Sequence, residues 1–370
     1  MWRDVLARME HHPEATTAQD LSAALSMDSD EYMEALFRAS YRVKEKNVGR
    51  IVYLRGLIEV SNICACDCYY CGLRCGNASV HRYCMTQDEV IGAALWAWRK
   101  GYGSVVLQAG ERRNADFVKF IENAVAEIKR QSNGELGVTL SLGEQTPDTY
   151  ARWFSAGAHR YLIRIETSDE VFYKAIHPAG SDFKARVKCL KELREIGYQV
   201  GTGVMIGLPG QTSESLANDI LFFKALDVDM LGMGPYIPHD GTPLAVQADD
   251  VEPVARFNMA LRMIALCRLT MPDINIASTT ALQALNPEGR EMGLLAGANV
   301  LMPNVTPTKY RGDYEIYPGK PCVQDTPDEC SRCLAGRIKA MGETIGFDKW
   351  GDSPHATGQK PKSSAITQKS

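Results

Sequence analysis

Six cysteines lie close together in the first quarter of the chain, at positions 64, 66, 68, 71, 75 and 84. Three of them, Cys64, Cys68 and Cys71, have the spacing C-x3-C-x2-C. Three thiolates can bind three irons of a [4Fe–4S] cube and leave the fourth iron open to a substrate or cofactor. This spacing therefore predicts a [4Fe–4S] cluster with one iron that has no protein ligand.

A structural zinc site is the alternative interpretation of the same stretch. Cys66 would then join Cys64, Cys68 and Cys71 to give four thiolates. The resulting pattern C-x-C-x-C-x2-C lacks the paired knuckles that are usual for structural zinc, so the iron–sulfur interpretation is favoured. Cys66, Cys75 and Cys84 are not assigned as cluster ligands.

A second group of cysteines, Cys322, Cys330 and Cys333, follows near the end of the chain at C-x7-C-x2-C. Three thiolates are an incomplete ligand set for a [2Fe–2S] cluster. Two interpretations stay open at this point, an accessory iron–sulfur site and three unligated thiols.

Strand-like and helix-like segments alternate from residue 51 onward. The β-rich run 51–60 leads directly into the first cysteine group, and Thr86 with Glu89 predicts a capping box at the start of the next helix. Alternation of this kind predicts a parallel sheet, and eight repeats favour a closed barrel over an open doubly wound sheet. Polar residues at many strand ends also favour the barrel. The predicted strands are 51–60, 104–109, 137–142, 160–166, 199–208, 228–234, 274–277 and 299–302.

The resulting fold class is α/β, a (β/α)8 TIM-type barrel with extensions at both ends. We expect a helical N-terminal extension over residues 1–50, the barrel over 51–306, and a C-terminal extension over 307–353 that carries the second cysteine group. Residues 354–370 are rich in Lys, Ser and Gln, and we expect them to be disordered and to contribute nothing to chemistry.

Composition excludes several classes of protein. The 370 residues carry a net charge of −4, so no bulk basic charge is present for binding nucleic acid. No apolar run approaches the ~18 residues that a membrane helix needs. The first residues contain Asp4, Glu10 and Glu14 and do not resemble a signal peptide, so we expect a cytoplasmic protein.

The cysteine motif at the end of the first strand resembles that of the radical S-adenosylmethionine (SAM) enzymes. More narrowly, the chain resembles the HydE family of [FeFe]-hydrogenase maturases, and more distantly biotin synthase and methylornithine synthase. The resemblance extends from the N-terminal helices to about Trp350. It is carried by VSNICACDCYYCGLRCGNASVHRYCMT (60–86), LQAGE (107–111), TLSLGE (139–144), GAHRYLIRIET (157–167), MIGLPGQT (205–212), GMGPYIPH (232–239) and GANVLMPN (297–304).

The resemblance implies a cofactor and residues that bind it. A reduced [4Fe–4S] cluster would cleave SAM into methionine and a 5′-deoxyadenosyl radical. Glu166 and Arg186 would hold SAM with Arg164 nearby, Glu111 would end a glycine–glutamate turn, and Tyr70 would shield the cluster or contact the adenine. Without the resemblance, Arg164 and Glu166 would be interpreted equally well as an ordinary ion pair at a strand end.

The resemblance also implies a substrate cavity inside the barrel. Hydroxyl groups and a cation would bind an anionic substrate there, although barrel-core hydrogen bonding is an almost equal interpretation of the threonines. The residues so assigned are Thr139, Arg160, Thr279, Thr280 and Tyr317. The resemblance further implies an accessory [2Fe–2S] or other cluster at Cys322, Cys330 and Cys333, as some members of the family have.

The implied function is a step in assembly of the hydrogenase H-cluster. The substrate would be an iron carbonyl–cyanide–cysteine complex made by the maturase HydG, with the scaffold maturase HydF and a low-potential electron donor as further partners. A radical SAM enzyme acting on an amino acid or thioether is the alternative. A non-catalytic iron–sulfur carrier is disfavoured, because a carrier needs neither a SAM-binding carboxylate nor a large barrel.

Overall fold

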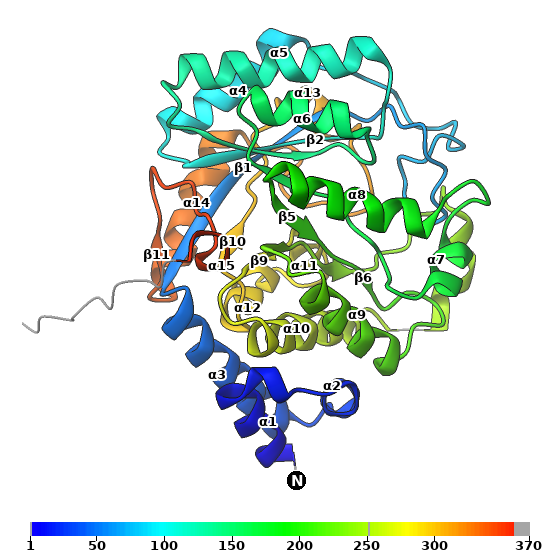
Figure 1. Ribbon diagram of the computed structural model, residues 1–370, viewed down its shortest axis with the longest axis vertical. Coiled ribbons are helices and arrows are strands. Elements are labelled where there is room, and N and C mark those ends of the chain that lie inside the picture. Colours follow the sequence, from blue (N-terminus) through cyan, green and yellow to red (C-terminus); the bar gives the residue numbers. More distant parts are fainter. Residues whose placement is uncertain (1, 251, 359–370) are drawn as a thin grey trace, which may run out of the picture.

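The computed structural model describes residues 2–250 and 252–358, and it contains a closed parallel barrel (Figure 1). Eight strands follow one another around the barrel, and the last pairs with the first through Tyr53 with Val300 and Leu54 with Leu301. This closure confirms the predicted (β/α)8 architecture and excludes the open sheet. The strands are β1 (Ile51–Ser61), β2 (Ser104–Ala109), β3 (Gly137–Ser141), β4 (Arg160–Leu162), β5 (Gln199–Thr202), β7 (Met230–Leu231), β9 (Asn275–Ser278) and β10 (Val300–Leu301).

Several strands are shorter than the sequence predicts. The predicted strand 160–166 ends at Leu162, because the pairing becomes irregular beyond it: Glu166 adopts a left-handed conformation with φ +64° and forms only an isolated parallel bridge with Val204. The predicted strands 199–208 and 228–234 are each divided in two. Their second parts, β6 (Met205–Ile206) and β8 (Gly234–Pro235), follow β5 and β7 along the chain and pair with each other in parallel as a separate two-stranded sheet.

Helices cover the outside of the barrel and bury one apolar stripe each. In α5 (Ala115–Gln131), Phe117, Val118, Ile121, Val125 and Ile128 are buried at the three- and four-residue spacing of a helix face. The other helices of this layer are α4 (Gln87–Arg99), with the predicted Thr86–Glu89 capping box, α6 (Pro147–Ser155), α7 (Glu170–Ile176), α8 (Phe183–Ile196), α9 (Ser213–Ala225), α10 (Pro253–Thr270), α11 (Thr280–Leu285) and α12 (Gly289–Leu295).

The N-terminal extension is helical, and it packs on α9 and α10 at the lower end of Figure 1. It consists of α1 (Trp2–His11), the 3-10 turn η1 (Pro13–Ala15), α2 (Ala18–Ser26) and α3 (Asp30–Asn47). Lys44 of α3 forms a fully buried ion pair of 3.0 Å with Glu343 of the C-terminal extension. The two extensions are therefore joined directly to each other.

The C-terminal extension returns along the barrel to its first strand. It contains α13 (Thr308–Arg311), α14 (Pro327–Ala340), β11 (Thr344–Ile345) and α15 (Pro354–Thr357), and β11 pairs in parallel with β1. The expected disorder does not hold for Pro354–Thr357, because Ser353 caps this helical turn through its hydroxyl. Residues 359–370 lie outside the described part of the chain.

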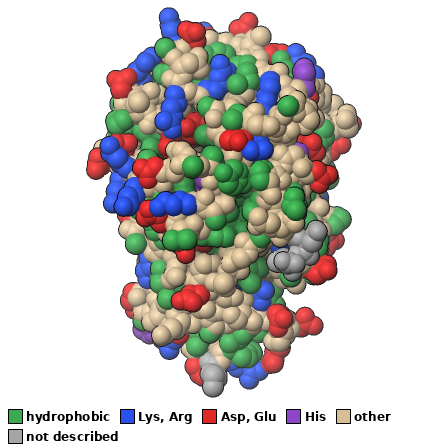
Figure 2. All heavy atoms as spheres, turned by 90° about the vertical axis from the view of Figure 1, so that its right-hand side faces the viewer, with side chains coloured by type: hydrophobic (Ala, Val, Ile, Leu, Met, Phe, Trp, Pro, Cys, Tyr) green, Lys and Arg blue, Asp and Glu red, His purple; other side chains and the backbone are tan. Residues whose placement is uncertain are grey.

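No helix within the described residues is both long and apolar enough to cross a membrane. Figure 2 views the molecule from the side on which α7 lies in Figure 1, and basic and acidic side chains are interspersed over that face. This mixture agrees with the small net charge of −4.

Candidate functional site

A cavity of about 330 Å³ opens at the carboxyl ends of the barrel strands. Parallel barrels gather their functional side chains at this end, because the loops that follow each strand meet there. Most of the predicted site residues line this cavity. They are Cys64, Cys68, Tyr70, Cys71, Glu111, Arg164, Glu166, Arg186, Thr279, Thr280 and Tyr317.

The loop after β1 places four cysteine side chains on this cavity, the predicted three and Cys66. The sulfur of Cys64 accepts hydrogen bonds from the backbone N–H of Cys66 at 3.4 Å and of Glu111 at 3.3 Å. The Asp67 carboxylate accepts hydrogen bonds from the Arg74 guanidinium at 2.7 Å and from the backbone N–H of Gly76 at 2.9 Å. These hydrogen bonds stabilise the loop that carries the four thiols.

Glu166 lines the cavity and has an unusual backbone conformation, with a left-handed φ of +64°. Left-handed φ is uncommon for a residue other than glycine, and such strain is typical of functional positions. Its carboxylate forms an ion pair with Arg164 at 2.9 Å, but the angle is not that of a hydrogen bond. Within the described residues, Glu166 Oε2 and Arg164 Nε and Nη2 are buried without hydrogen-bond partners. These groups retain capacity to bind a polar ligand.

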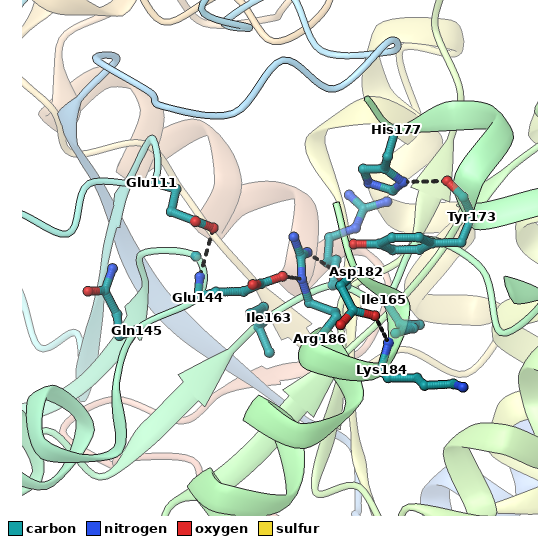
Figure 3. Close-up of polar contacts among 12 residues, drawn as sticks. Glu111, Glu144, Gln145, Ile163, Ile165, Tyr173, His177, Asp182, Lys184 and Arg186 are labelled. Atoms are coloured by element: carbon teal, nitrogen blue, oxygen red, sulfur yellow. Dashed lines mark hydrogen bonds and ion pairs between the residues drawn. The ribbon is translucent and has the colours of Figure 1, made fainter. Parts of the chain in front are cut away.

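Arg186 belongs to an ionic network that joins three βα loops (Figure 3). It bonds to Glu144 and to the carbonyl oxygen of Arg164, the latter at 2.8 Å. The Arg113 guanidinium donates to the Glu144 carboxylate at 3.1 Å and to the Glu111 carboxylate at 2.6 Å. The Glu111 carboxylate also accepts from the backbone N–H of Glu144 at 2.8 Å. Burial opposes the charge of Arg186, but neighbours including the Glu144 carboxylate raise the pKa of Arg186 above its ordinary value. Arg186 is therefore a fixed cation at the rim.

Tyr70 is oriented by His177, which follows α7. The Nδ1 of His177 donates to the carbonyl oxygen of Tyr173 at 2.8 Å (Figure 3), so its Nε2 accepts from the Tyr70 hydroxyl at 3.0 Å. Burial lowers the pKa of His177 to about 4, which keeps the ring neutral and the acceptor available near pH 7. The resemblance indicated Tyr70, but its contact with His177 is seen only in the folded chain.

The cavity fits the cluster and SAM that the cysteine motif implies. Soft thiolates suit iron, and the paired charges of Arg164 and Glu166, whose facing atoms make no hydrogen bond within the described residues, suit the charged groups of an amino acid. At Gly110 a Cβ would lie 2.4 Å from the Ile63 carbonyl oxygen and 2.7 Å from the Cys64 Cβ, so only glycine lets the two loops approach this closely. Burial raises the pKa of Cys71 to about 12, and iron binding would have to displace that proton.

Within the described residues, no three His, Cys, Asp or Glu side chains converge on a point suited to one metal ion. A four-iron cube attaches each thiolate to a different iron and does not require such convergence.

The substrate side of the cavity contains both predicted and unpredicted residues. Thr279 donates to the carbonyl oxygen of Met233 at 2.9 Å, and Thr280 accepts from Arg290 at 3.3 Å, so both threonines also have structural hydrogen bonds. The sequence did not predict Lys320, which lines the cavity and forms an ion pair with the buried Glu59. The one feature of the sequence that could have indicated Lys320 is its position between the predicted site residues Tyr317 and Cys322.

Thr139 and Arg160 do not reach this cavity, contrary to the expectation from sequence. Arg160 is the first residue of β4, and the amino ends of barrel strands lie opposite the mouth. Its side chain is fully buried and bonds to Thr139 at 2.9 Å, to the carbonyl oxygen of Trp350 at 3.1 Å, and to Asp352. Thr139 lines a separate space of about 20 Å³ inside the barrel. We therefore withdraw the assignment of both residues to substrate.

The second cysteine group is only partly assembled. The neighbouring Cys330 thiol, followed by burial, raises the pKa of the Cys322 thiol, and Cys330 is buried on α14. Cys333 lies one turn later on the same helix and is exposed. The proximity of Cys322 and Cys330 is compatible with a shared metal centre and with a simple thiol pair.

Comparisons with known proteins agree with this geometry. Residues 58–223 match the model of the Radical SAM superfamily. The chain is 42% identical over 349 residues to the [FeFe] hydrogenase maturase subunit HydE of Thermotoga maritima, covering 94% of this chain and 97% of that protein.

Two other proteins are similar at lower identity. The 3-methylornithine synthase of Methanosarcina acetivorans is 27% identical, covering 76% of this chain and 77% of that one. The solved structure of the FeFe-hydrogenase maturase HydG from Carboxydothermus hydrogenoformans superposes with a TM-score of 0.78 at 19% identity. It covers 94% of this chain and 79% of the HydG chain, and at this identity the match concerns the fold alone.

Proposed function

Because this chain belongs to the HydE family of [FeFe]-hydrogenase maturases, which are radical SAM enzymes, we propose that its barrel cavity acts on an iron carbonyl–cyanide–cysteine complex during H-cluster assembly. The observation that carries the proposal is the 42% identity over 97% of the Thermotoga maritima protein. The complex would come from HydG, HydF would act as a scaffold, and a low-potential donor would supply the electron.

Residues of the cysteine loop and of its neighbouring strand ends would hold the cofactors. Cys64, Cys68 and Cys71 would bind the [4Fe–4S] cluster, and Glu166 with Arg164 would bind the polar groups of SAM. When bound, the cluster supplies the electron that cleaves SAM to methionine and a 5′-deoxyadenosyl radical. The protein's own contribution is to orient SAM and to exclude water from the cavity.

The polar groups around the cavity support an anionic substrate. Thr279, Thr280 and Tyr317 offer hydroxyls, and Lys320 adds an ammonium group from the C-terminal extension. Glu59 partly neutralises Lys320, so the pair would position an anion without leaving an isolated buried charge. The proposed substrate site therefore keeps Thr279, Thr280 and Tyr317, adds Lys320, and leaves out Thr139 and Arg160.

The test compares substrates for their ability to stimulate SAM cleavage. Anaerobically reconstituted protein receives SAM, dithionite and either the iron complex or an amino acid such as lysine, and 5′-deoxyadenosine is quantified. We expect the iron complex to stimulate its formation above the level without substrate. Stimulation by the amino acid alone would contradict the proposal and favour a methylornithine-synthase-like reaction.

A further inference from the structure

Cys66 is a fourth thiol on the cavity wall that the three-cysteine motif does not use. Its side chain lines the same cavity as Cys64, Cys68 and Cys71. In the sequence it alternates with two of these cysteines, Cys64 and Cys68. Four thiols therefore surround one cavity, one more than the cluster motif uses.

The position of Cys66 is fixed by its backbone. Its N–H donates to the sulfur of Cys64 at 3.4 Å, and its carbonyl oxygen accepts from the N–H of Cys75 at 2.9 Å. The sulfur of Cys64 also accepts from the backbone N–H of Glu111 at 3.3 Å. The backbones of Cys66 and Glu111 therefore approach the same thiol, beside the cavity that both side chains line.

A second observation concerns the polar groups of this part of the cavity. The side chain of Glu166 is only 8% exposed, and its Oε2 lies 2.9 Å from Arg164 in an ion pair but makes no hydrogen bond within the described part of the chain. Cys66 and Glu166 line one continuous cavity. The thiol therefore shares the space in which a polar ligand of Glu166 would bind.

We propose that Cys66 is an exchangeable fourth ligand of the cluster, bound to the open iron in the absence of SAM and displaced when SAM binds. This inference rests on the cluster of the proposed function. An iron with three sulfides and no protein ligand would otherwise bind water, and thiolate is the softer and preferred ligand. Cys66 would thus protect the resting cluster without being required for its assembly.

The exchange balances in bonds and protons. The bond from iron to the Cys66 sulfur breaks, and bonds from iron to the amine and carboxylate of SAM form. The ammonium group of SAM loses one proton to become a ligand, and the released Cys66 thiolate takes up one proton. No oxidant or reductant is needed, and two donors on one molecule replace a single thiolate.

Competition of this kind lowers the apparent affinity for SAM. The apparent Kd equals the intrinsic Kd divided by the fraction of protein whose iron is open. If Cys66 occupies the iron in nine of ten molecules, removing its thiol tightens SAM binding about tenfold.

Cys75 provides the matched control, because it lies in the same loop but is exposed and does not line the cavity. The experiment uses anaerobically reconstituted full-length wild type, Cys66→Ala and Cys75→Ala. Mössbauer spectra of 57Fe-labelled clusters are recorded with and without SAM, and SAM binding is titrated for each protein.

Without SAM, we expect four similar thiolate-bound irons in wild type and Cys75→Ala, but one distinct iron in Cys66→Ala. With SAM, the three spectra should converge, and Cys66→Ala should bind SAM several-fold more tightly. Identical spectra and affinities for wild type and Cys66→Ala would overturn the proposal. Loss of the whole cluster in Cys66→Ala alone would also overturn it, because Cys66 would then be an obligatory ligand. Neither result depends on hydrogenase maturation, so failure here is distinguishable from failure of the proposed function.

Discussion

Asp352 forms an ion pair with Arg160 and joins the C-terminal extension to the amino end of the barrel. Arg160 is fully buried, whereas the Asp352 side chain is 22% exposed. Nearby, Arg55 and Asn275 both donate to the carbonyl oxygen of Gly351, at 3.1 and 2.8 Å. Residues of the extension therefore close the floor of the barrel, on the side opposite the cysteine loop.

The first prediction is that this ion pair stabilises the fold. Asp352→Ala leaves the Arg160 guanidinium buried without its anionic partner, and breaking a buried pair costs about 3 kcal/mol or more. We expect this loss in the free energy of unfolding, measured by chemical denaturation. Asp348→Asn, at an exposed position of the same extension, serves as the control and should change stability little. Equal stability of both variants would show that Asp352 contributes nothing.

The second prediction concerns pH. Burial lowers the pKa of His159 to about 4 from its ordinary 6.5, and the adjacent charge of Arg160 acts in the same direction. Between these values the unfolded chain binds a proton that the folded chain does not, so stability falls as pH decreases from 6.5 to 4. Burial would raise the pKa of Asp352, but His159 and Arg160 lower it overall, so its contribution is lost only at still lower pH.

The His159→Gln variant tests this assignment. It removes one titrating group, so the dependence of stability on pH between 6.5 and 4 should become shallower by up to about 1.4 kcal/mol per pH unit, the value for one proton. His177 has a similarly lowered pKa and should maintain part of the slope. An unchanged slope in the variant would mean that His159 does not titrate in this way.

The third prediction concerns the orientation of Tyr70. His177→Ala removes the acceptor of the Tyr70 hydroxyl, and a lost hydrogen bond of this kind is worth about 1 kcal/mol. We expect SAM to bind roughly fivefold more weakly to the cluster-loaded variant, as measured by equilibrium titration. His12→Ala, at an exposed position of the N-terminal extension, is the control. If both variants bind SAM equally, Tyr70 does not depend on His177.

The fourth prediction concerns the second cysteine group. The triple change of Cys322, Cys330 and Cys333 to Ala should lower the iron content of reconstituted protein and leave SAM cleavage intact. The physical reason is that these thiols are not among the residues lining the mouth cavity. Loss of 5′-deoxyadenosine formation in a folded variant would show that this site is not accessory.

Short-range spacing was the most informative part of the sequence. The three cysteines of the motif lie within the stretch 64–71, so the sequence alone places them together in the loop after β1. The alternation of strands and helices predicted the barrel for the same reason, because each βα unit is defined by its own periodicity. The closure of the barrel was predicted from the number of these units, which is eight.

Contacts between residues far apart in the sequence could not be predicted in this way. Lys320 and Asp352 reach opposite ends of the barrel from the C-terminal extension, and no periodicity reports such a contact. Arg160 was misplaced because resemblance assigned it to the cavity, whereas its position at the start of β4 sets it at the floor. The position of a residue along its strand was therefore more informative than its charge.

Hydrogen evolution by matured hydrogenase tests the central claim most directly. Apo-hydrogenase is mixed with SAM, dithionite, the iron complex, the remaining maturation proteins and one of three forms of this protein: wild type, Cys68→Ala or Cys75→Ala. We predict hydrogen evolution with wild type and Cys75→Ala, and none above the protein-free control with Cys68→Ala. Intact SAM cleavage by wild type without any hydrogen evolution above that control would contradict the account.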